Sequence, residues 1–184
     1  RYIVLILIVL ALLALVYSSF GTYNGLVASR EGTTAQWAQV ESQYQRRFDL
    51  IPNLVEAVKG TMKQEQAVFG AIAEARTQYG GAKTISEKTQ AATALDGALS
   101  RLLIVMEQYP ELRSIDTVTT LMSQLEGSEN RIAVERQRFN QAAQAYNTSL
   151  QLFPTSVIAR FGGFQQIEYT KANTEAQVAP KVSL

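Results

Sequence analysis

An unbroken apolar run occupies the N-terminal end of this sequence. Residues 2–20, YIVLILIVLALLALVYSSF, contain no charged side chain. At ~1.5 Å per residue, a helix of this length spans roughly 28 Å, close to the ~30 Å hydrocarbon core of a bilayer. A cleaved secretory signal is the alternative, but its apolar region is normally about 7–15 residues long and precedes an Ala-x-Ala-type site. We therefore expect residues 1–21 to form a retained transmembrane anchor that contacts membrane lipid through residues 2–20.

The charges that flank this run bear on its orientation. Arg1 precedes the run, and the next basic residue is Arg30. Basic residues prefer the cytoplasmic flank of a membrane helix. This favours an N-terminus in the cytoplasm, with the domain that follows on the opposite side of the membrane.

Beyond the anchor, apolar residues recur with helical spacing nearly as far as residue 153. One stripe advances in steps of three or four residues, as on one face of a helix, through Trp37, Val40, Tyr44, Phe48, Ile51, Val55, Val58 and Met62. The last helical segment has a heptad-like pattern typical of a coiled coil. We expect an all-α protein in which residues 22–153 form an antiparallel, up-and-down four-helix bundle with long first and last helices. Residues 154–184 are expected to form a loop and an extended C-terminal tail.

The helix boundaries rest on glycine, proline and capping residues. A turn near Gly60 is our preferred interpretation, although the apolar stripe keeps its phase there and one longer helix is the alternative. After the next break, Thr84 or Ser86 is the expected N-cap of the third helix. Pro110 and Pro154 mark the following two boundaries.

Charged residues interrupt the apolar stripes of the first and last helices. Arg46, Arg47 and Asp49 occur in the first, and Glu129 and Arg136 in the last. Because buried charges are tolerated only when they are paired, we interpret these five residues as a structural polar layer that fixes helix register. Loss of Glu129 would then leave a buried arginine without its partner, at a cost of about 3–5 kcal/mol.

Pro52 has two architectural interpretations. Inside a helix it removes one backbone hydrogen bond and produces a kink. Alternatively, it lies in the first turn of a separate helix that Asp49 caps.

The composition excludes several classes of function. The chain has no histidine and no cysteine, which removes the usual zinc ligands and the commonest general base. Its 17 basic and 16 acidic residues give a net charge of +1, without the basic excess typical of nucleic-acid binding. No Walker or dinucleotide-binding motif is present. We expect no enzyme activity, no cofactor and no nucleic-acid partner; an enzyme that uses only carboxylates, arginines and tyrosines is the weaker alternative.

A short apolar segment follows the last helix and contains one basic residue, Arg160. Its apolar residues are Val157, Ile158, Phe161 and Phe164. Their side chains either lie at a membrane interface or plug the end of the bundle.

An ordered set of motifs resembles the LemA family over nearly the whole chain: YNGLV, QYQRRFDLIPNLVEAVKG, AIAEAR, YPELRS, SENRIAVERQRFN and FPTSVIA. The resemblance implies a membrane-anchored helical bundle. It implies no settled biochemical activity, although one relative is implicated in building magnetosome membranes and some family genes neighbour membrane proteases. Further matches to family motif positions, with no catalytic role known to accompany them, are Asn53, Asn130, Arg131, Asn140 and Asn147.

These observations predict a non-enzymatic, single-pass protein of the bacterial inner membrane whose domain faces the periplasm or the extracellular side. Long first and last helices would leave part of their shared seam uncovered, which favours a homo-oligomer that acts as an envelope or membrane scaffold. The alternative is a monomeric adaptor that presents a helical face to another membrane protein, such as a protease.

Overall fold

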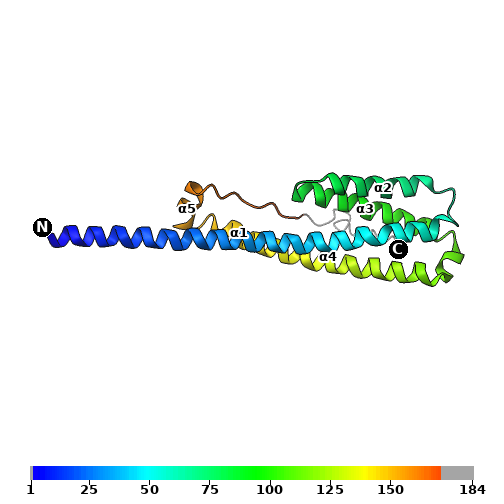
Figure 1. Cartoon of the computed structure of the whole chain (residues 1–184), viewed down its shortest axis with the longest axis horizontal. Helices are drawn as coiled ribbons and strands as arrows, with labels where there is room; N and C mark the ends of the chain where they lie inside the picture. The colour runs from blue at the N-terminus through cyan, green and yellow to red at the C-terminus, as the bar shows by residue number, and fades with distance from the viewer. Residues whose placement is uncertain (1, 171–184) are drawn as a thin grey trace, which may run out of the picture. The chain divides into compact units, whose positions relative to one another are not determined.

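The computed structural model describes residues 2–170, which contain five α-helices and one short 3-10 helix but no strand (Figure 1). The elements in chain order are α1 (Tyr2–Lys59), α2 (Gln66–Gly81), α3 (Ile85–Met106), η1 (Pro110–Ser114), α4 (Asp116–Ser149) and α5 (Thr155–Phe161). The all-helical class predicted from the sequence is confirmed for these residues. The apolar run and the first amphipathic helix form one continuous element, α1.

The N-terminal part of α1 is apolar enough to span a membrane. It has a mean hydropathy of 2.9 over its most apolar window, and none of that window is buried in the protein. Large side chains there are highly exposed, for example Tyr2 at 82% and Leu15 at 65%. Such exposure is costly in water but not in lipid. By length and composition, α1 therefore carries a candidate membrane span.

Local sequence signals determine where the helices end. Helix α1 stops at Lys59, and the amides of Thr61 and Met62 donate to the carbonyl of Val58 at 3.1 and 2.9 Å. The turn expected near Gly60 is therefore present. Helix α3 begins with a capping box: the Thr84 hydroxyl accepts from the amide of Glu87 at 3.1 Å, and the Glu87 carboxylate accepts from the amide of Thr84 at 3.0 Å. Of the two N-cap candidates that the sequence offered, Thr84 and Ser86, the structure has Thr84 as the cap.

The described chain divides into two units, the first formed by residues 2–38 with 137–169 and the second by residues 39–136 with 170. Helices α1 and α4 each contribute to both. In the second unit, Phe48 of α1 contacts Tyr79 near the end of α2, with ring centroids 4.3 Å apart. Its core draws on all four helices and includes Val40, Ile51, Leu54, Val58, Met62, Ile72, Leu95, Leu102, Val118 and Ile132.

The first unit pairs the early part of α1 with the late part of α4. Trp37 packs edge-on against Phe139 with ring centroids 5.2 Å apart. Farther towards the N-terminus, Leu26 is buried with Tyr146 and Ala159. Ala159 belongs to α5, a seven-residue helix in the segment for which the sequence predicted a loop.

A glycine pair ends α5 and turns the chain back. Gly163 has a φ of 69°, in the left-handed region that favours glycine. A Cβ on Gly162 would lie 2.7 Å from the ring of Phe164. The two glycines therefore permit Phe164 to fold back onto the core.

Candidate functional site

Three charged side chains from three helices meet inside the second unit. Arg47 of α1 lies with its Nη1 atom 2.6 Å from Oδ1 of Asp96 in α3, and the same atom donates a hydrogen bond to Oε2 of Glu129 in α4. The side chains are 9%, 21% and 45% exposed, respectively. One mostly buried cation is thus held between a half-buried carboxylate and a more solvated one. Among the described residues, Nε of Arg47 is buried without a hydrogen-bond partner.

The cluster contains only part of the polar layer that the sequence indicated. Arg47 and Glu129 are brought together, as expected for two partners in one layer. Arg46 and Asp49 are exposed, and the Asp49 carboxylate accepts from Nε2 of Gln45 at 2.8 Å. Arg136 is half-buried and contributes to the electrostatics of the neighbouring Tyr44.

Asp96 is the member of the cluster that the sequence reasoning missed. It lies four residues after the buried Ala92 and next to the buried Leu95. A carboxylate one turn beyond a core position is the signal that could have identified it.

The pKa values of two tyrosines in the second unit, Tyr44 and Tyr79, are raised. Burial raises the pKa of Tyr44 to about 12, opposed by Arg136 and Arg47 and reinforced by the carboxylates of Asp96 and Glu129. Burial, with the charge of Glu41 and contact with Tyr44, also raises the pKa of Tyr79. Both phenols therefore keep their protons at neutral pH and are poor acids or bases there.

A second ion pair joins α1 to α3. Lys88 donates to the carboxylate of Glu41, and both side chains are partly buried. Along α1 the order is Glu41 then Arg47, and along α3 it is Lys88 then Asp96. The two helices consequently run in the same direction through these contacts.

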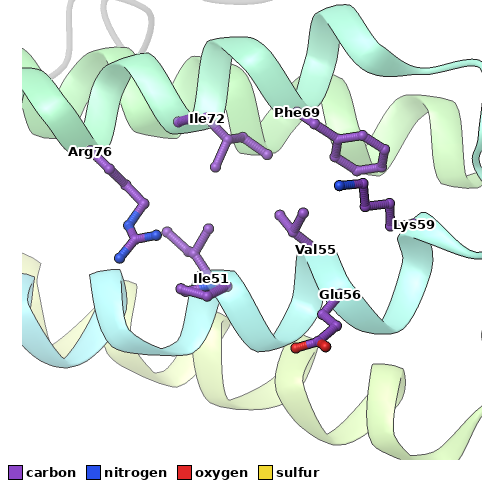
Figure 2. Close-up of a pocket in the computed structure, with 9 residues that line it drawn as sticks. Ile51, Val55, Glu56, Lys59, Phe69, Ile72 and Arg76 are labelled. Carbon is purple, nitrogen blue, oxygen red and sulfur yellow. The ribbon is translucent and has the colours of Figure 1, made fainter.

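A hollow of about 380 Å³ lies between α1 and α2 in the second unit. Figure 2 shows Phe69, Ile72 and Arg76 directed from α2 towards α1, with Val55 and Lys59 directed back. No ion pair is formed by either Lys59 or Arg76 within residues 2–170. The lining also contains one carboxylate, Glu56, so the hollow combines an apolar floor with an excess of one positive charge. This combination suits an apolar group that carries a negative charge.

The first unit contains a polar clamp built around Asn147. Its side chain is buried; Nδ2 donates to the carbonyl of Ile167 at 2.8 Å, and Oδ1 accepts from the amide of Ile167 at 2.9 Å. The hydroxyl of Tyr146 donates to the carbonyl of Gln165 at 3.1 Å. These bonds fix the segment after α5 along α4. The clamp gives a physical role to one family motif position.

The other motif positions lie elsewhere. Asn53, Asn130 and Arg131 are exposed, whereas Asn140 is half-buried. Helix α1 continues without interruption through Pro52, so Pro52 does not begin a separate helix capped by Asp49.

Within residues 2–170, no three acidic side chains gather as in a metal site. The described residues define a wholly helical protein with one candidate membrane span and an internal ion-pair cluster. Residues 36–184 match the model of the LemA family, and the chain belongs to that family.

Curated relatives match most of the chain. Magnetosome proteins MamQ 2 and MamQ 1 of Paramagnetospirillum magneticum are each 29% identical over 191 residues, covering 90% of this chain and 70% of their own length. Magnetosome protein MamQ of Magnetospirillum gryphiswaldense is 30% identical over 187 residues, covering 88% and 69%. This chain is therefore similar to these proteins over most of both lengths.

Proposed function

We propose that this protein is a non-enzymatic, single-pass membrane protein that self-associates into a scaffold at a bacterial inner membrane. The observation that carries the proposal is the continuous helix α1, which joins an exposed apolar segment directly to the packed helices of the second unit. In this account those helices form an up-and-down four-helix bundle. The likeness to magnetosome proteins is consistent with a role at a membrane.

The non-enzymatic role is supported by the chemistry of the charged cluster. Arg47 is engaged by both Asp96 and Glu129, and the tyrosine beside it is held in its neutral form. The arrangement offers no activated nucleophile next to a general base, which covalent catalysis requires. We assign the cluster to the register of α1, α3 and α4.

Self-association is supported by an apolar surface on α3. Ile104 is 63% exposed and Leu103 is 40% exposed. A hollow of about 360 Å³ lies at Leu103; its lining residues are Leu103, Met106, Glu107, Val118, Thr119 and Met122. The exposed apolar side chains on α1 beyond the span and on α4 are Tyr23, Val27 and Val134, at 43%, 37% and 46%, so none is as exposed as Ile104. We therefore propose the α3 surface as the contact, in place of the seam of the first and last helices.

A second copy of the chain is the occupant that we propose for the α3 surface. Copies anchored in one bilayer share one plane, so the same surface on two copies can meet about a two-fold axis. Confinement also raises their effective concentration. The lining contains a single charged residue, Glu107, so little charge opposes such a contact.

Site-directed crosslinking in membranes tests this contact. The chain contains no cysteine, so Ile104→Cys and Gln124→Cys each provide one reactive position; Gln124 is exposed on α4 and serves as the matched control. With a short bis-maleimide reagent, we expect a dimer from Ile104→Cys and little from Gln124→Cys. A monomer from both variants would contradict self-association through this surface.

The hollow between α1 and α2 favours the adaptor as the second candidate. Its apolar floor and its excess of positive charge, Lys59 and Arg76 against Glu56, fit an acidic, apolar segment of another membrane protein. The double variant Lys59→Gln/Arg76→Gln would then lose crosslinks to that partner while retaining its own fold and any self-association. Unchanged crosslinking would reject the adaptor site.

A further inference from the structure

A second exposed apolar surface lies at α5, and no other part of residues 2–38 and 137–169 covers it. Phe161 is 89% exposed and Phe153 is 84% exposed, while Leu152 and Val157 are 58% and 46% exposed. Two almost fully exposed phenylalanines within nine residues of sequence are unusual on a protein surface that faces only water. We call these four residues the α5 apolar surface.

The opposite side of α5 is fixed to the protein. Ala159 is buried with Leu26 and Tyr146, and Phe164 and Ile167 pack against this cluster. The Asn147 clamp holds the segment that follows. The sequence left open whether this segment plugs the fold or meets a membrane, and the structure separates its side chains into an inner set and an outer set.

The position of α5 along α1 gives the depth of this surface. The ring of Tyr23 packs edge-on against Phe164, with centroids 5.3 Å apart. Tyr23 lies three residues beyond Phe20, the last residue of the apolar run, or ~4.5 Å along the helix axis. The polar layer of a bilayer extends roughly 5–8 Å beyond the hydrocarbon core on each side. Tyr23 and Phe164 therefore fall at headgroup level, and Ala159 of α5, which is buried with Leu26 ~9 Å beyond Phe20 along the axis, lies at the outer edge of that layer. Figure 1 shows α5 beside α1.

The chemistry of the outer surface suits that level. Arg160 and Ser156 line an open hollow of about 690 Å³ together with Val157 and Phe161. Arginine binds phosphate oxygens, and phenylalanine and leucine are typical of the apolar face that interfacial helices bury at the boundary between headgroups and acyl chains. Apolar and cationic groups at one depth are the combination found in helices that lie in a membrane interface.

We infer that the α5 apolar surface docks into the headgroup layer of the membrane that α1 spans, with Phe153 and Phe161 inserted and Arg160 at lipid phosphates. This inference rests on the anchor of the proposed function but not on self-association. The docked surface supplies a second point of attachment, which restrains the tilt of the first unit on the membrane. The protein would thus contact the bilayer both through α1 and beside it.

Full-length protein in vesicles of phosphatidylcholine and phosphatidylglycerol tests this docking. Single cysteines at Phe161, Phe153, Gln141 and Val16 would carry an environment-sensitive fluorophore, because the chain has no cysteine of its own. Gln141 is exposed on α4 and represents water; Val16 represents the span. At positions 161 and 153 we expect a blue-shifted emission, several-fold weaker quenching by aqueous iodide than at position 141, and quenching by shallow nitroxide-labelled lipid.

The other outcomes overturn the inference in distinguishable ways. Iodide quenching at both phenylalanine positions equal to that at position 141, with position 16 protected, would reject docking and leave the anchor intact. Protection from iodide and from nitroxide lipid together would mean that protein covers the surface, and would also reject docking. A position 16 accessible to iodide would reject the anchor itself.

Discussion

The charged cluster makes a quantitative prediction about which carboxylate stabilises the fold. Because Arg47 is only 9% exposed but has two acidic partners, removal of one carboxylate leaves the other in place. Glu129 is 45% exposed, so Glu129→Ala should cost about 1 kcal/mol, within the range of exposed ion pairs. Asp96 is 21% exposed, and Asp96→Ala should cost about 1–2 kcal/mol. The double variant leaves a buried guanidinium without a carboxylate, at about 3–5 kcal/mol.

The sequence alone predicts the larger cost for Glu129→Ala, and the structure lowers it because Asp96 is a second partner. Reversible denaturation of full-length protein in detergent, followed by circular dichroism, measures these free energies. The double variant should lose on the order of 10 °C in Tm, more than the two single losses added together. Glu126→Ala, an exposed carboxylate on α4, is the control. Strict additivity, or a cost near 4 kcal/mol for Glu129→Ala alone, would refute the shared-cation account.

Three further predictions follow from individual contacts. Burial raises the pKa of Tyr44 from 10.0 to about 12, so the stability that the protonated phenol contributes is fully present below pH 10 and is lost towards pH 12. Between these pH values the free energy of unfolding of the native chain should fall by about 2–3 kcal/mol more than that of the Tyr44→Phe variant. Thr84→Ala removes the α3 cap and should cost about 1 kcal/mol in a thermal melt, with Ser86→Ala nearly neutral; equal effects would contradict the capping role. Asn147→Ala breaks two hydrogen bonds to Ile167 and should cost about 1–3 kcal/mol. Hydrogen exchange in α5 should rise with it, and Gln144→Ala should leave that exchange unchanged.

The helical core could be predicted because burial follows a simple period. Of the stripe from Trp37 to Met62, all but Val55 are buried, since one side chain per turn must face the neighbouring helices. Helix ends at Lys59 and Thr84 followed from a glycine and a capping residue. These signals are local, so one sequence is enough to read them.

The missed features depend on contacts between distant residues or on short elements. Arg47 and Glu129 are 82 positions apart, and no local pattern shows that Asp96 joins them from a third helix. Helix α5 has only seven residues, too few for periodicity to reveal. The clamp of Asn147 on Ile167 likewise forms only once the chain has turned back. The expected tail beyond residue 170 lies outside the described residues.

Self-association can be tested by the mass of full-length protein in mild detergent, measured by light scattering with the micelle subtracted. For a self-associating membrane scaffold we expect one discrete assembly larger than the 20.3 kDa chain. This assembly should dissociate when Ile104 is replaced by glutamate and remain intact when Gln124 is replaced by glutamate. A mass of a single chain across the accessible concentration range would contradict self-association and leave the adaptor as the surviving function.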